Sequence, residues 1–208
     1  MTDKFGNSGV SVVNKPDKRL EKATIIVLGP GRSGTSLVAN LLGKSGVDMG
    51  DYTSATAEDL KMASILKNKN YGAINAFCDE KFKKLNFWGW KRPETINHLD
   101  EVDKEVISPV YICLFRDVFA IAKRNEVSMG RDVSEGIHSS LRSYMRMNNF
   151  IKETDAPLIM ISFEKLKEDY QLLFSALSKV VEIDYTVSDN VLAEMKELKE
   201  VYLKTSRI

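Results

Sequence analysis

A short apolar run that stops at a glycine-rich loop constrains the fold of this chain more than any other stretch. Residues 23–28 read ATIIVL, and Gly29-Pro-Gly-Arg-Ser-Gly-Thr-Ser36 follows directly. A continuous apolar run of this length is typical of a strand covered on both faces, as in a parallel sheet. From Gly34 onward apolar residues recur at helical spacing, and Gly46 is a typical helix stop. Strand, glycine turn and helix together predict the first unit of an α/β domain that binds phosphate.

The rest of the chain alternates between strand and helix patterns. Further strands are predicted over residues 110–115 (VYICLF), 157–163 (PLIMISF) and 87–91 (FWGWK). Helices are predicted at 57–66, 71–84, 132–152 and 188–202. Strands separated by helices predict an α/β fold, a parallel sheet flanked by helices.

Composition bounds the class of protein without naming its chemistry. A chain of 208 residues can form one domain with a full core. Because 30 Lys and Arg balance 29 Asp and Glu, for a net charge of +1, no nucleic-acid surface is indicated. The two cysteines make a disulfide framework improbable, which fits a reducing compartment.

The first 22 residues are polar and charged. We therefore expect a flexible N-terminal arm over 1–22 and a single domain over 23–208. No apolar run approaches the roughly 18 residues of a membrane span, and none suits a signal peptide. The expectation is a cytoplasmic protein without a membrane span.

The loop differs from a nucleotide-hydrolase loop in the place of its cation. Such a loop reads G-x-x-x-x-G-K-[ST], whereas this one has Thr35 where the lysine belongs, and Arg32 three residues earlier. Glycines let backbone N–H groups converge on an anion at the start of the helix. A P-loop small-molecule kinase remains an alternative, although the strand 110–115 runs into Arg116 before it reaches Asp117. A cation at that edge suits a second phosphate better than a magnesium ion.

Several of these segments, in order, resemble one family. Residues 30–37 (PGRSGTSL) are similar to the P-x-[KR]-[ST]-G-T-[ST]-x loop of PAPS-dependent sulfotransferases, where PAPS is 3′-phosphoadenylyl sulfate. Residues 113–118 (CLFRDV) resemble the family's strand ending in Arg-Asp/Asn-Pro. Residues 88–93 (WGWKRP) and 161–166 (ISFEKL) resemble the W-x-W-K-D-P and "v-s-y-e-d-l" segments of small bacterial and phage-type members. The resemblance implies a P-loop NTPase-like sulfotransferase fold.

The resemblance also implies a set of binding residues. The 5′-phosphosulfate would be held by the loop residues Gly31, Arg32, Ser33, Gly34, Thr35 and Ser36. Arg116 would bind the 3′-phosphate. Two positions depart from the family pattern: Val118 replaces its proline, and Arg124 stands where it usually has a serine that donates to the 3′-phosphate. Arg124 is either a charged replacement for that serine or a solvated helix residue.

The implied reaction moves a sulfonate from PAPS to a hydroxyl or amine of a carbohydrate or small molecule, in line and without a metal, leaving PAP. Arg32 would stabilise the departing phosphate electrostatically, since a guanidinium does not deprotonate. Lys91 is a candidate second cation or a solvated lysine. Glu58 is the favoured base, with Asp51 and His98 as alternatives.

The acceptor and the oligomeric state are left open by the sequence, and a homodimer is compatible with it. A catalytically degenerate nucleotide-binding domain is the non-enzyme alternative, because of the departures at Val118 and Arg124.

Overall fold

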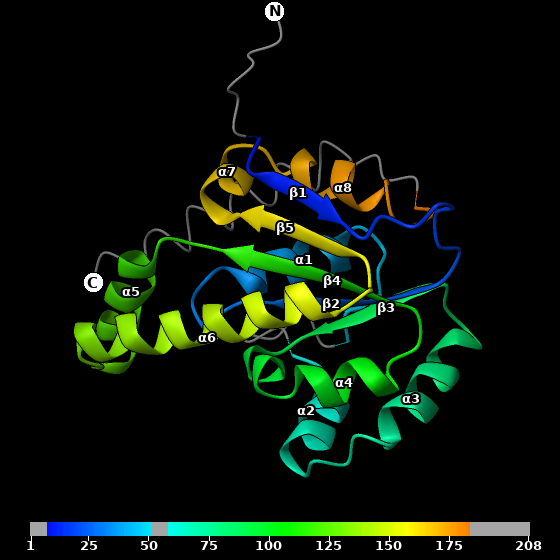
Figure 1. Cartoon of the computed structure of the whole chain (residues 1–208), viewed down its shortest axis with the longest axis horizontal. Coiled ribbons are helices and arrows are strands. Elements are labelled where there is room, and N and C mark those ends of the chain that lie inside the picture. Colours follow the sequence, from blue (N-terminus) through cyan, green and yellow to red (C-terminus); the bar gives the residue numbers. More distant parts are fainter. Residues whose placement is uncertain (1–7, 51–57, 184–208) are drawn as a thin grey trace, which may run out of the picture.

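The computed structural model describes residues 8–50 and 58–183, which form a five-stranded sheet between two layers of helices (Figure 1). The strand order is β1-β5-β4-β2-β3. Strands β2 to β5 are parallel to one another, and β1 is antiparallel to β5. The strands are β1 (Val10–Val13), β2 (Ala23–Leu28), β3 (Phe87–Lys91), β4 (Pro109–Phe115) and β5 (Leu158–Ser162).

Helices α1, α7 and α8 cover one face of the sheet, and α2 to α6 with the short 3₁₀ helix η1 lie on the other side. Their bounds are α1 (Thr35–Lys44), α2 (Leu60–Lys67), α3 (Ala73–Phe82), η1 (Pro93–Asn97), α4 (Leu99–Glu105), α5 (Val118–Met129), α6 (Val133–Glu153), α7 (Phe163–Glu168) and α8 (Gln171–Leu177). The predicted α/β fold, a sheet flanked by helices, is confirmed.

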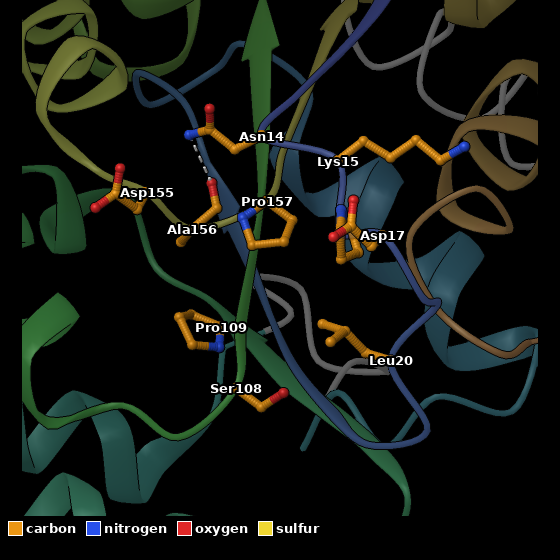
Figure 2. Close-up of a pocket in the computed structure, with 10 residues that line it drawn as sticks. Asn14, Lys15, Asp17, Leu20, Ser108, Pro109, Asp155, Ala156 and Pro157 are labelled. Atoms are coloured by element: carbon orange, nitrogen blue, oxygen red, sulfur yellow. Dashed lines mark hydrogen bonds between the residues drawn. The ribbon is translucent and has the colours of Figure 1, made fainter.

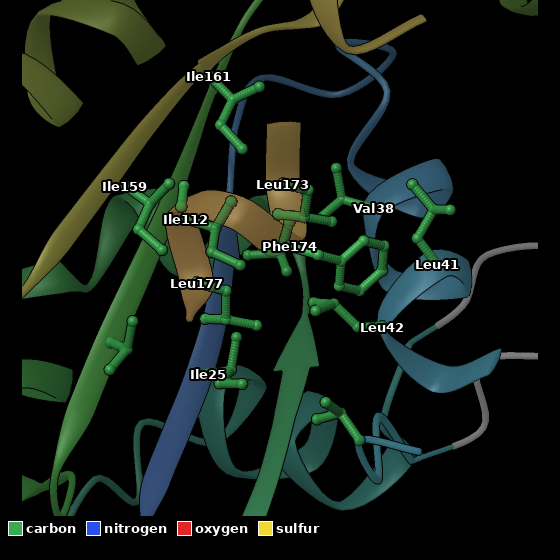
Figure 3. Packing of buried hydrophobic residues seen from close by; sticks show 14 of the residues in the cluster. Ile25, Val38, Leu41, Leu42, Ile112, Ile159, Ile161, Leu173, Phe174 and Leu177 are labelled. Carbon is green, nitrogen blue, oxygen red and sulfur yellow. The ribbon is translucent and has the colours of Figure 1, made fainter. Parts of the chain in front are cut away.

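The central strands bury both faces, which explains their continuous apolar sequences. In β2, Ile25 points into a core that also contains Leu42 of α1 and Phe174 of α8 (Figure 3). The adjacent Ile26 points to the opposite core, which contains Trp90 of β3. All six residues of β2 are buried. A two-faced core of this kind holds the loop that follows β2 at a fixed place on the sheet edge.

The expectation of a flexible arm over residues 1–22 is wrong for residues 10–13, which form β1. Val10 pairs with Ile161 and Val12 with Ile159, and the Ser162 N–H donates to the Gly9 oxygen at 2.7 Å. Val10 and Val12 also pack against the core under the α1 face. Because the strand is only four residues long and lies among polar residues, its local pattern is weak. The sheet is consequently mixed, with one antiparallel edge strand beside the predicted parallel core.

Most of the predicted helices lie close to their expected places. The helix predicted over 132–152 is α6, and Asp132 caps it by accepting from the Glu135 N–H at 3.1 Å. The predicted tail helix at 188–202 lies outside the described residues, and so does Asp51. Within the described ranges, no helix combines the length and apolarity needed to cross a bilayer.

Candidate phosphate-binding site

Four parallel strands bring their carboxyl ends to one edge of the sheet. The glycine loop follows β2, Lys91 ends β3, Arg116 follows β4 and Phe163 follows β5. In open α/β sheets ligands bind beyond this edge. The parallel arrangement therefore gathers side chains that are far apart in the sequence.

The loop between β2 and α1 depends on two residues with left-handed backbone conformations. Arg32 has φ 70° and Gly34 has φ 105°. Gly34 lies so close to the Phe163 ring that a Cβ atom at this position would overlap it. Inside the loop, the Ser33 N–H donates to the Pro30 oxygen at 3.0 Å. Gly34 thus meets two requirements that only glycine satisfies without strain, a positive φ and a close approach to an aromatic ring.

The loop holds buried polar atoms that the chain does not satisfy. Among the described residues, the Arg32 Nε and the Ser33 Oγ are buried without a hydrogen-bond partner. Gly34 is the N-cap of α1; no described side chain caps this end of the helix and its first turn contains no acid. The first N–H groups of a helix have no partner within the helix, and its positive end favours an anion. Together these features make the loop a candidate site for an anionic group.

Arg116 is attached to this loop and supported from two sides. Its Nη1 donates to the Arg32 carbonyl oxygen at 2.8 Å, and its Cζ lies 4.6 Å from the centre of the Phe163 ring. Its backbone N–H donates to the Tyr144 hydroxyl at 2.8 Å, and that hydroxyl donates to the Arg116 oxygen at 3.0 Å. Burial raises the pKa of Tyr144 to about 12, so this hydroxyl keeps its proton near neutral pH. The Arg116 side chain is therefore held directly against the phosphate loop.

Lys91, predicted as either a second cation or a solvated lysine, is buried, with a side chain only 3% exposed. Its Nζ lies 3.3 Å from Glu58 Oε1, and Arg92 Nη1 donates to Glu58 Oε2 at 2.7 Å. Burial lowers the pKa of Lys91, and the charges of Arg92 and Arg32 lower it further, while Glu58 opposes them. The structure thus brings together the predicted residues Arg32, Glu58 and Lys91.

The alternative bases are placed differently. His98 lies at the start of α4, and its Nδ1 is 2.8 Å from the Tyr71 hydroxyl. Asp51 lies outside the described residues. Glu58 is the candidate base that the structure joins to the predicted cations.

Arg124 lies on α5 and is half-buried. That helix begins beyond Arg116, with Asp117 as its cap, which accepts from the Ala120 N–H at 2.7 Å. A role of Arg124 at the 3′-phosphate remains a prediction.

The sequence did not predict three residues that shape the site: Tyr144, Phe163 and Arg92. Tyr144 lies within the helix predicted over 132–152, where no motif marked it as a site residue. Phe163 carried a usable signal, because it is the last residue of a predicted strand, and the glycine loop and Arg116 also lie where predicted strands end. Arg92 follows Lys91 directly, but its pairing with Glu58 spans residues that no local pattern connects.

A separate groove of about 480 Å³ lies at the opposite end of the sheet, near the beginning of β4 and β5 (Figure 2). Asn14, Pro109 and Pro157 line it together with Lys15, and Asn14 donates to the Ala156 oxygen at 3.2 Å. The groove is open. Arg32 and Ser33, whose buried polar atoms have no partner among the described residues, do not line it. The carboxyl edge is therefore the stronger candidate site.

Sulfotransferase domains of known structure share this fold. The sulfotransferase domain from the curacin biosynthetic pathway superposes with a TM-score of 0.57 at 14% sequence identity, covering 82% of this chain and 77% of that one. The sulfotransferase domain from the Synechococcus PCC 7002 olefin synthase gives a TM-score of 0.57 at 18% identity, covering 83% and 77%. No protein-family model matches the chain, and no curated protein matches it significantly. The fold is thus that of sulfotransferase domains, at a sequence distance that leaves the activity to be argued from the site.

Proposed function

We propose that the chain is a PAPS-dependent sulfotransferase that transfers a sulfonate to a hydroxyl or amine of a carbohydrate or small molecule. One observation carries the proposal: the Arg32 Nε and Ser33 Oγ are buried and have no partner among the described residues, in a loop at the start of a helix. The ordered motif resemblance and the fold shared with sulfotransferase domains support the same conclusion.

In this proposal the nucleotide is held at two points. The backbone and hydroxyl groups of residues 31–36 and the Arg32 side chain bind the 5′-phosphosulfate. Arg116, attached to the loop through the Arg32 carbonyl oxygen, binds the 3′-phosphate, with Arg124 as a second donor. Lys91 lies close enough to Arg32 for their charges to interact, and it provides a second cation for the leaving phosphate.

Glu58 takes the proton of the acceptor. A carboxylate offers about four acceptor positions, and Lys91 and Arg92 use two of them. As the acceptor oxygen or nitrogen forms its bond to sulfur, its proton passes to Glu58. The bond between sulfur and the phosphate oxygen breaks, and PAP leaves with that electron pair.

Thermal unfolding with PAP tests the proposal without knowledge of the acceptor. PAP at a hundred times its Kd should stabilise the folded chain by about 2.7 kcal/mol. Arg32→Ala and Arg116→Ala should each reduce or abolish the shift. Arg146→Ala is the matched arginine control, because Arg146 is an exposed residue on α6 that bonds Asn97. The folded chain showing no shift with millimolar PAP would contradict the proposal.

The same assay separates the alternatives. Stabilisation by ATP with Mg²⁺ and indifference to PAP would indicate a small-molecule kinase instead. Stabilisation by PAP without transfer from PAPS to a broad panel of hydroxyl and amine acceptors would support a nucleotide-binding domain that has lost its activity.

A further inference from the structure

We propose that Glu58 acts as a positioning residue for Lys91, holding its ammonium group charged and aimed at the phosphate loop before any acceptor binds. The inference rests on the proposed function and adds to the role of Glu58 as a base. It assigns a task that is measurable in nucleotide binding alone.

The register of β3 against β2 places Lys91 next to the phosphate loop. Lys91 pairs in register with Val27 of β2, two residues before the glycine loop, and directly opposed residues share a face of a sheet. Val27 belongs to the core that α1 covers. The Lys91 side chain therefore starts on the α1 face, beneath the end of the helix that the anion would approach.

Lys91 also depends on the charges around it. Its side chain is 3% exposed, so water contributes little to stabilising its charge. Among the described residues, the charged groups that act on it are Glu58, Arg92 and Arg32, and of these only Glu58 is negative. A carboxylate favours the protonated form of a buried ammonium that is close to two guanidinium groups.

Glu58 is itself held in place by Arg92. Arg92 Nη1 bonds Glu58 Oε2 at 2.7 Å, while the Arg92 Nε and Nη2 bond Glu94 at 2.9 and 2.6 Å. The guanidinium is thus fixed between two carboxylates. It fixes one oxygen of Glu58 and leaves the other for Lys91, at 3.3 Å.

The inference predicts a pH-dependent defect. Burial lowers the pKa of Lys91 and Glu58 opposes that effect, so Glu58→Gln should lower this pKa further. As the pH rises through the lowered value, Lys91 loses its proton and its attraction for the nucleotide. In the wild type the same loss should come at higher pH.

The test is calorimetric titration with PAP at pH values from about 6 to 9.5. Wild type and Glu58→Gln should bind alike at the acidic end. At the alkaline end Glu58→Gln should bind about tenfold more weakly, the effect of one charge-assisted hydrogen bond. In the Lys91→Arg background, where the cation cannot deprotonate, Glu58→Gln should produce no such decline.

Arg92→Gln is the matched control, because it removes the other partner of Glu58 and leaves Lys91 in place. The PAP affinity of Arg92→Gln should begin to decline at a pH no lower than in the wild type, since Arg92 itself lowers the pKa of Lys91. Thermal unfolding of each variant establishes that it is folded.

Two results would overturn the inference: parallel pH profiles for wild type and Glu58→Gln, or an equal loss in the Lys91→Arg background. A wild type that binds no PAP at any pH would instead contradict the proposed function, and the inference with it.

Discussion

A hydrogen-bond network at the amino end of the sheet and the phosphate loop at its carboxyl end treat their polar groups in opposite ways. At the amino end, the Tyr111 hydroxyl donates to Asp103 at 2.7 Å and Thr154 Oγ1 donates to the other Asp103 oxygen at 3.0 Å. Asn14 then donates to the Thr154 carbonyl oxygen at 2.7 Å. At the carboxyl end, Arg32 and Ser33 bury polar atoms that have no partner among the described residues.

This difference distinguishes a structural network from a binding site. Burying a polar atom without a partner costs about 1–3 kcal/mol. In the network around Asp103 that cost is avoided within the chain, which ties β1, α4, β4 and the end of α6 together. At the phosphate loop a bound ligand can supply the missing hydrogen bonds and so remove this cost. The contrast therefore predicts stability effects at one end and binding effects at the other.

The largest effect is expected at Gly34. Gly34→Ala introduces a Cβ at φ 105° against the Phe163 ring, and strain plus overpacking should cost about 2–5 kcal/mol of the free energy of unfolding. The matched control is Gly31→Ala, where a Cβ meets nothing within 4 Å. Chemical denaturation measures both, and equal stability of the two variants would contradict the loop geometry.

The next effect tests the amino end. Tyr111→Phe leaves one oxygen of the half-buried Asp103 carboxylate without its donor, and the loss of this hydrogen bond to a charged group should cost about 1–3 kcal/mol of unfolding free energy. PAP affinity should remain that of the wild type, because Tyr111 belongs to the network at the far end of the sheet. Denaturant unfolding and PAP titration are measured on the same sample. A loss of PAP affinity without a loss of stability would contradict the proposed contrast between a structural network and a binding site.

Tyr144→Phe is the tyrosine counterpart at the carboxyl end. It removes the hydroxyl that bonds both the N–H and the carbonyl oxygen of Arg116. We expect a loss of about 1 kcal/mol in stability and roughly a threefold to tenfold loss in PAP affinity, since Arg116 loses its support. If Tyr144→Phe and Tyr111→Phe have the same effect on PAP affinity, the two ends do not differ as proposed.

The smallest effect is expected at Arg124. If Arg124 replaces the family's serine at the 3′-phosphate, Arg124→Ala should weaken PAP binding several-fold, less than Arg116→Ala does. The affinity for 5′-AMP, which has no 3′-phosphate, should not change. No loss for either nucleotide would assign Arg124 to the solvated surface of α5, and an equal loss for both would show that it does not act at the 3′-phosphate.

The sequence predicted those parts of the site that lie next to strong local patterns. Arg32 and Arg116 follow apolar strands directly, and parallel strands place such residues on the same edge of the sheet. Lys91 was predicted as a candidate cation, but its burial was not, because burial depends on how β3 packs between β2 and the covering segments. The loop and four of the five strands followed from the same reasoning.

The partners of these residues could not be predicted in this way. Tyr144 reaches Arg116 across 28 residues of sequence, and Arg92 reaches Glu58 across 34. Strand β1 was missed because its four residues are stabilised by pairing with β5 rather than by their own pattern. Contacts of this kind arise only when distant segments meet in the folded chain.

Calorimetric titration of the wild type and Arg32→Ala with PAP, in the presence of EDTA, tests the central claim most directly. We expect one PAP bound per chain without a metal, and about a hundredfold weaker binding by Arg32→Ala, the loss of a strong charge-assisted contact. Folded wild type that binds no PAP, or Arg32→Ala that binds PAP as tightly as the wild type, would contradict it.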